Sequence, residues 1–153
     1  MWLLVGFACL LAPVPGAVQT PFAPTGAYAG HWGVDLAAEM GTAVRAPVGG
    51  TVSFAGSVAG MLTVTIVSGE MKVSVSYLSS VGVSRGDEVQ AGEVVGQSGV
   101  AHGGDALHLS VRLHGQYVDP APFLACRFGP ISDALRLVPY PDRSANRIAG
   151  RNL

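Results

Sequence analysis

Short apolar runs separated by glycine-containing turns fill the chain from His31 to Leu124. The clearest run alternates without a fault, with leucine or valine at every second position from Leu107 to Leu113 and polar or small residues between them. A period of two is typical of a half-buried β-strand. Runs of this kind predict strands over residues 43–46, 51–55, 62–67, 72–77, 93–97, 107–113 and 116–118. Hairpin turns are expected around Gly69 and at Gly115.

Composition agrees with an all-β fold that has many turns. The 153 residues include 21 glycines and 10 prolines, and no segment shows a long 3.6-residue period, so we expect almost no helix. A length of 153 residues suits one domain with short tails. Charged residues make up 12% and the net charge is −1, which argues against disorder and against a nucleic-acid partner.

The first residues predict a signal for export. Residues 2–11 form an apolar stretch, which Pro13 ends before the small residues Gly16 and Ala17, although no basic residue precedes the stretch. We therefore expect residues 1–18 to be a signal peptide, with the mature protein starting near Ala17 outside the cytoplasm, in the cell wall or secreted. Cys126 would then be the only thiol, without an intrachain disulfide, and is expected to act as a small buried hydrophobe.

Three further regions follow the predicted signal. Residues 19–29 are a turn-rich lead-in, residues 30–126 the domain, and residues 127–153 a mildly basic tail that we expect to be flexible.

The segment from Gly30 to Leu36 carries a first pair of candidate metal ligands. Written as an extended strand, it directs Trp32, Val34 and Leu36 to one face and His31, Gly33 and Asp35 to the other. An imidazole and a carboxylate on one open face can bind the same zinc ion, and Gly33 leaves space between them. The alternative is a half-buried strand with two unrelated polar residues.

His108 is the candidate third ligand. It lies on the polar face of the alternating strand, where a core histidine is not expected. Three protein ligands leave the fourth position of a tetrahedral zinc ion open for water, and open sites of this kind are catalytic.

The run from Gly30 to Leu124 resembles the lysostaphin and LytM type of zinc peptidases, which cleave peptides of bacterial cell walls. The segments that carry the resemblance are His31-x-Gly33-x-Asp35, the run from Gly41 to Val52, the run from Val83 to Gly96, and Leu107-His108 followed by Arg112, Gly115 and Val118-Asp119-Pro120. The resemblance implies a compact antiparallel β-sheet sandwich or partly open barrel, with a groove on the sheet. It also implies that His31, Asp35 and His108 bind one zinc ion.

Two catalytic positions depart from that family. The histidine that precedes Leu-His is Ala106 here, and the histidine of a Tyr-x-His-Leu segment is Tyr77. The side chain of alanine cannot transfer a proton. The hydroxyl of Tyr77 can donate a hydrogen bond, so Tyr77 is a candidate hydrogen-bond donor to the oxyanion. His102, in the glycine-rich loop before the ligand strand, is a candidate base, with Asp105 to orient it. The alternative for His102 is an exposed loop histidine without a role.

The resemblance implies a zinc metalloendopeptidase that acts on stem or cross-bridge peptides of peptidoglycan, as a monomer. Because both histidines are replaced, a second hypothesis is a zinc-containing wall-binding factor, or an activator of another wall hydrolase, without hydrolysis of its own. A third is a biotinyl or lipoyl carrier domain, since Lys72, the only lysine, lies in a Met-Lys-Val hairpin.

Overall fold

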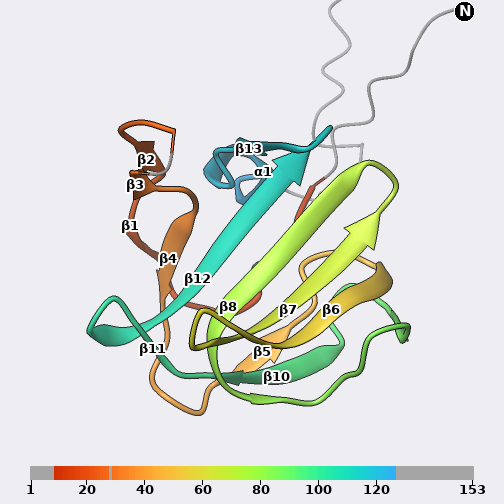
Figure 1. Ribbon diagram of the computed structural model, residues 1–153. Helices are drawn as coiled ribbons and strands as arrows, with labels where there is room; N and C mark the ends of the chain where they lie inside the picture. The colour runs from red at the N-terminus through yellow and green to blue at the C-terminus, as the bar shows by residue number, and fades with distance from the viewer. Residues whose placement is uncertain (1–8, 28, 127–153) are drawn as a thin grey trace, which may run out of the picture.

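Thirteen short strands and one four-residue helix make up the described part of the computed structural model, residues 9–27 and 29–126 (Figure 1). The elements are β1 (Val18–Thr20), β2 (Ala23–Pro24), β3 (Gly30–His31), β4 (Val34–Ala37), β5 (Ala43–Arg45), β6 (Gly50–Val58), β7 (Met61–Ser68), β8 (Met71–Val81), β9 (Glu88–Val89), β10 (Val94–Ser98), β11 (Val100–Ala101), β12 (Gly104–Leu113), β13 (Gln116–Val118) and α1 (Ala121–Leu124). The prediction of an all-β fold with almost no helix is confirmed. No helix in this part of the chain is long and apolar enough to cross a membrane.

One antiparallel sheet carries most of these strands, in the order β1-β4-β12-β8-β7-β6-β9, with edges at β1 and β9, so that it does not close into a barrel. The predicted hairpin turns at residues 69–70 and 114–115 join β7 to β8 and β12 to β13. A third turn, at Ala59 and Gly60, has positive φ at both residues, as a two-residue hairpin requires. This turn extends β6 and β7 beyond the predicted ends.

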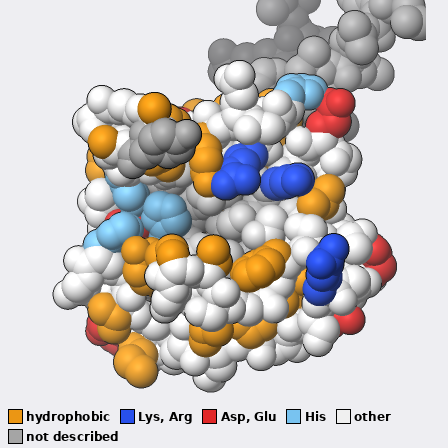
Figure 2. Space-filling model, in the orientation of Figure 1, with side chains coloured by type: hydrophobic (Ala, Val, Ile, Leu, Met, Phe, Trp, Pro, Cys, Tyr) orange, Lys and Arg blue, Asp and Glu red, His pale blue; other side chains and the backbone are white. Residues whose placement is uncertain are grey.

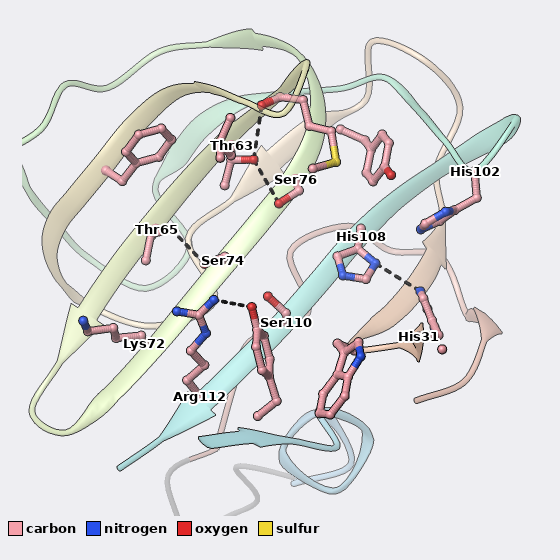
Figure 3. A pocket seen from close by; sticks show the side chains of 17 residues that line it. His31, Thr63, Thr65, Lys72, Ser74, Ser76, His102, His108, Ser110 and Arg112 are labelled. Atoms are coloured by element: carbon pink, nitrogen blue, oxygen red, sulfur yellow. Dashed lines mark hydrogen bonds between the residues drawn. The ribbon is translucent and has the colours of Figure 1, made fainter. Parts of the chain in front are cut away.

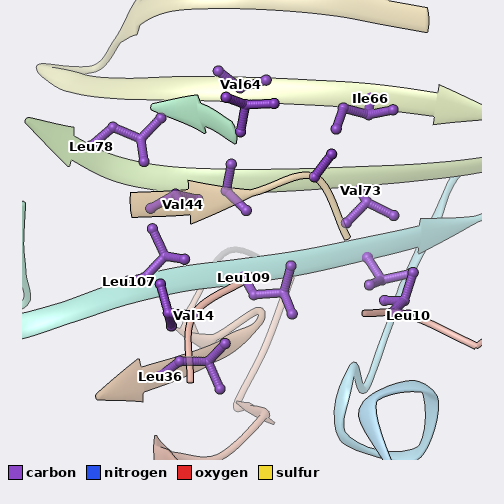
Figure 4. Packing of buried hydrophobic residues seen from close by; sticks show 14 of the residues in the cluster. Leu10, Val14, Leu36, Val44, Val64, Ile66, Val73, Leu78, Leu107 and Leu109 are labelled. Carbon is purple, nitrogen blue, oxygen red and sulfur yellow. The ribbon is translucent and has the colours of Figure 1, made fainter. Parts of the chain in front are cut away.

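The core lies on one face of this sheet. Leu107, Leu109 and Val111 of β12 are fully buried, while the residues between them face the other side. Figure 4 shows how side chains from β4, β5, β7 and β8 pack against the same face. Because the apolar set of each strand occupies this face, the polar set is left to form the opposite face, where the candidate ligand His108 lies.

Residues 9–16 also pack against this core. Leu10 and Val14 are only 2% exposed, and Figure 4 shows both beside the core strands. The backbone of this segment is bonded as well, from the amide of Leu10 to the carbonyl of Phe123 at 3.0 Å and from that of Leu11 to Pro47 at 2.9 Å. Cleavage near Ala17, as expected for a signal peptide over residues 1–18, would remove these contacts from the folded body.

Cys126 is not the free thiol expected from the sequence. It forms a disulfide with Cys9, with 5.3 Å between the two Cα atoms, and closes a loop over 117 positions of the chain. The sequence analysis missed the pair because it assigned Cys9 to a segment that is removed. The predicted flexible tail, residues 127–153, lies outside the described residues.

Candidate metal centre

His31 ends the short strand β3, and a backbone contact fixes the orientation of its ring. Nδ1 donates a hydrogen bond to the carbonyl oxygen of Pro21 at 2.8 Å. This bond leaves the lone pair on Nε2, which points toward Asp35 Oδ1 at 3.2 Å. Metal-binding histidines commonly donate their second ring N–H to a carbonyl in this way. This contact could not be predicted from the sequence, because the acceptor is a main-chain atom ten residues away.

Asp35 and His108 lie directly opposite each other on the neighbouring strands β4 and β12. Asp35 Oδ1 and His108 Nδ1 are 2.9 Å apart, and the Asp35 side chain is only 3% exposed. Burial lowers the pKa of His108, because desolvation disfavours the charged ring, although the hydrogen bond that the ring donates to Asp35 opposes this shift. A lowered pKa favours the neutral imidazole, which is the form that can bind a metal ion.

Gly33 makes the close approach of these groups possible. A Cβ atom at Gly33 would lie only 2.6 Å from His108 Nε2, a distance at which the histidine could not stay in place. The extended strand expected through this segment is wrong in one respect. The chain bends at Trp32 and Gly33, between β3 and β4, so Trp32 lines the groove instead of facing the core with Val34 and Leu36.

The three donor atoms match the size of a metal ion. His31 Nε2 and His108 Nδ1 are 3.1 Å apart, and both lie within 3.2 Å of Asp35 Oδ1. Ligands of a tetrahedral zinc ion, bonded at about 2.0–2.2 Å, stand about 3.3 Å from one another. A site with two imidazoles and one carboxylate therefore fits zinc, with room for a fourth ligand.

His102 lies beside these three residues. It forms the tip of the β11–β12 hairpin together with Gly103, and both have positive φ, as a type I′ turn requires. His102 Nε2 lies 3.6 Å from Asp35 Oδ1, and the donor atoms of the four residues all lie within 4.8 Å of one another. The ring is half exposed, so it borders the metal centre from the solvent side. In the described structure, the Asp105 side chain makes no hydrogen bond to His102, so it does not orient the ring as expected.

A groove of about 510 Å³ extends from these histidines over the polar face of the sheet (Figure 3). Its floor consists of the outward residues of β7, β8 and β12, including the serines and threonines labelled in the figure. Trp32 and Tyr117 line it on one side, with their ring centroids 5.6 Å apart. Figure 2 shows the hollow with histidine side chains at one end. An extended peptide laid along this floor would pass the metal centre.

Comparison with known proteins identifies the family. The sequence profile of peptidase family M23 matches residues 29–120. The chain belongs to peptidase family M23. The match also covers Lys72 and its hairpin, so the residues that suggested a carrier domain are part of the peptidase fold.

The curated relatives that the chain matches are longer than the chain itself. Over 124 residues the chain is 32% identical to the lipoprotein NlpD/LppB homologue of Pseudomonas aeruginosa, covering 75% of this chain and 39% of that protein. It is 35% identical over 94 residues to the DD-carboxypeptidase/endopeptidase Mpg of Neisseria meningitidis, covering 59% of this chain and 22% of that one. The chain thus spans less than half the length of these relatives. The catalytic domain of the antimicrobial peptidase lysostaphin from Staphylococcus simulans has a TM-score of 0.63 at 25% identity, covering 72% of this chain and 93% of that domain.

Tyr77 reaches the groove of this M23 fold through a β-bulge. Leu78 and Ser76 pair with consecutive residues of β7, which leaves Tyr77 without a partner on that strand, at φ 64°. A bulge shifts the alternation of a strand by one residue. Ser76 and Tyr77 consequently both line the groove, and the ring centroid of Tyr77 lies 5.0 Å from that of His102. The sequence pattern did not predict the bulge.

Ala106 and His114 lie outside the cluster of candidate metal-binding atoms. Ala106 is buried in β12, opposite Ala37 of β4. His114 lies in the exposed β12–β13 turn, where its Nδ1 is 2.8 Å from a Glu70 carboxylate oxygen. His102 is therefore the one imidazole of the described residues, besides the two candidate ligands His31 and His108, that lies at the candidate metal centre.

Proposed function

We propose that this M23 chain is an exported zinc endopeptidase that hydrolyses stem or cross-bridge peptides of bacterial peptidoglycan. The observation that carries the proposal is the fourth group of the cluster, His102, whose Nε2 lies 3.6 Å from Asp35 Oδ1 at the end of an open groove. His31, Asp35 and His108 would hold the zinc ion. The resemblance to lysostaphin-type peptidases supports the substrate class.

His102 is assigned the role of the base. A zinc ion, if held by His31, Asp35 and His108, would supply Lewis-acid polarisation of the scissile carbonyl. His102 Nε2 accepts a proton from the attacking water as its oxygen bonds to the carbonyl carbon. The same proton then passes to the leaving amine when the C–N bond breaks. A general base of this kind must lie within hydrogen-bond reach of the water, about 2.6–3.2 Å, and the solvent side of the cluster is where that water enters.

Tyr77 is assigned the role of stabilising the oxyanion. Its ring centroid lies 6.3 Å from that of His108, on the groove side of the cluster. A phenolic hydroxyl is a poor base near neutral pH but a good hydrogen-bond donor, so it suits the negative charge that develops on the carbonyl oxygen. His102 and Tyr77 together would replace the two histidines of the family pattern.

Replacing His102 by alanine is expected to lower kcat by about 100-fold or more, the usual contribution of a positioned base, and to leave one bound zinc ion. The measurement is the release of products from purified wall peptides, followed by mass spectrometry, together with metal analysis of the same sample. Asp105→Asn is the matched control, because its side chain makes no hydrogen bond to His102 in the described structure; its rate should stay within about twofold of the unaltered protein.

A rescue variant separates loss of the base from loss of the fold. Adding Ala106→His to the His102→Ala protein restores the imidazole of the family pattern, and hydrolysis should recover at least about tenfold, a fraction of what a positioned base supplies. Full activity of the His102→Ala protein would show that another group takes the proton.

A non-hydrolytic role is the second candidate, because Ala106 and Tyr77 replace both histidines of the family pattern. In that case the zinc-loaded protein should bind wall peptides, or stimulate another wall hydrolase, and leave the peptides uncut. The disulfide of Cys9 and Cys126 supports export under either candidate, because such bonds persist mainly outside reducing compartments.

A further inference from the structure

We propose that Lys72 and Arg112 form a carboxylate-binding subsite at the end of the groove away from the metal centre. The inference rests on the proposed function, since it assigns part of the peptide that the same groove would bind. It concerns two residues to which neither the family pattern nor the metal cluster gives a role in binding. Figure 3 shows both side chains on the floor strands, apart from the labelled histidines.

The register of the sheet brings the two cations together. Lys72 of β8 and Arg112 of β12 lie directly opposite each other, four pairs along the two strands from Ser76 and His108. All four residues line the groove, because positions two apart on a strand share a face. Four residues along β12 separate Arg112 from His108, which corresponds to about 13 Å between their Cα atoms.

No acidic side chain of the described residues neutralises this pair. Neither Lys72 nor Arg112 has a carboxylate within 4.0 Å in the described structure, and both side chains are exposed. The nearest acid along the chain, Glu70, is paired with His114 instead. Like charges directly opposite each other on a sheet are destabilising, so an anion bound between them would stabilise the arrangement.

Arg112 is held in position by the wall of the groove. Its guanidinium carbon lies 4.3 Å from the centroid of the Tyr117 ring, and the same group donates a hydrogen bond to the Tyr117 hydroxyl. Tyr117 in turn packs against Trp32, near the metal centre. A guanidinium fixed in this way loses little freedom on binding, and its fork of N–H groups suits a carboxylate.

The spacing specifies where that carboxylate should be. An extended peptide advances about 3.3 Å per residue, so the 13 Å between Arg112 and His108 corresponds to about four residues. The side chains of Lys72 and Arg112 are long and can shorten the distance that the peptide must span. A peptide whose scissile bond lies at the metal centre should therefore present its carboxylate two to four residues away. The substrate class is an acidic wall peptide, not a neutral one.

The test compares one wall peptide in two forms, with its carboxylates free and with all of them converted to amides. Binding to the zinc-loaded full chain is measured by titration calorimetry at low salt, in the His102→Ala protein so that the peptide stays intact. The free acid is expected to bind about tenfold more tightly, as charge-assisted hydrogen bonds are stronger than neutral ones. Lys72→Gln should reduce this preference to about twofold or less, and Lys72→Glu should reverse it.

Arg85→Gln is the matched control, since Arg85 is an exposed cation in a loop outside the groove, and its preference should remain about tenfold. Equal binding of the two forms by the unaltered groove, no binding of either, or a preference that Lys72→Gln leaves intact would each overturn the subsite. Failure of the proposed function is separate. If the protein that retains His102 binds the free acid more tightly but does not cleave it, the subsite proposal stands and the peptidase proposal fails. If it cleaves both forms and binds them with equal affinity, the peptidase proposal stands and the subsite proposal fails.

Discussion

Replacing His108 by alanine is expected to remove the stoichiometric zinc ion from the protein. Loss of residues that merely orient a ligand already costs about 10- to 100-fold in metal affinity, and His108 would be a ligand itself. Thermal stability should fall in parallel, because bound metal stabilises only the folded state. With free zinc at 100 times its dissociation constant that contribution is about 2.7 kcal/mol. Metal analysis after dialysis and thermal unfolding with and without zinc provide the two measurements.

The matched control for His108→Ala is His114→Ala. His114 is also a histidine beside a carboxylate, but it lies in the exposed turn next to Glu70. This variant should keep its zinc and its zinc-dependent stabilisation. If the His108→Ala protein kept one zinc ion with unchanged affinity, the assignment of the three ligands would be wrong.

Removing residues 1–16 is expected to unfold the domain or bring it close to unfolding. The truncated chain loses its disulfide, which typically contributes about 2–5 kcal/mol in a small domain. It also loses the buried side chains of Leu10 and Val14, worth about 1.5–3 kcal/mol each. These losses together are comparable with the whole stability of a typical domain, about 5–15 kcal/mol. Denaturant unfolding of the full and truncated chains gives the difference directly.

A double variant, Cys9→Ser with Cys126→Ser, separates the two contributions. It retains the packing of Leu10 and Val14, so its free energy of unfolding should fall only by the contribution of the disulfide.

The truncation also bears on export. Because residues 9–16 contribute to the core, we expect the protein recovered from the cell envelope to begin at or before Cys9. If a chain that begins at Ala17 proves as stable as the full chain, the signal peptide would end near Ala17, as expected from the sequence.

Strand positions could be predicted from the sequence because each strand buries one face. In β12 the alternation of leucine and valine with polar residues determines which side chains face the groove, so the position of His108 followed from the pattern alone. The approach of Asp35 to His108 did not follow from it. That contact depends on the pairing of β4 with β12, which the alternation within each strand does not determine. The resemblance to lysostaphin-type peptidases implied only that the two residues bind the same zinc ion.

Features that break the regular pattern could not be predicted. The bulge at Tyr77 and the bend at Trp32 change which face a residue occupies, and both depend on tertiary packing. Residues 9–16 were interpreted as part of a signal because an apolar stretch looks the same whether it packs on a core or enters a membrane. The position of His102 depends on a turn with positive φ, which histidine adopts more readily than most residues but which its sequence does not require.

Anomalous X-ray diffraction at the zinc absorption edge tests the proposed open zinc centre most directly. Crystals of the full chain grown with zinc should show a single strong peak bonded to His31 Nε2, Asp35 Oδ1 and His108 Nδ1 at about 2.0–2.2 Å. The fourth position should hold a water molecule within hydrogen-bond reach of His102 Nε2, about 2.6–3.2 Å. Absence of a peak among these three atoms, or His102 Nε2 bonded to the ion itself in place of the water, would contradict the account.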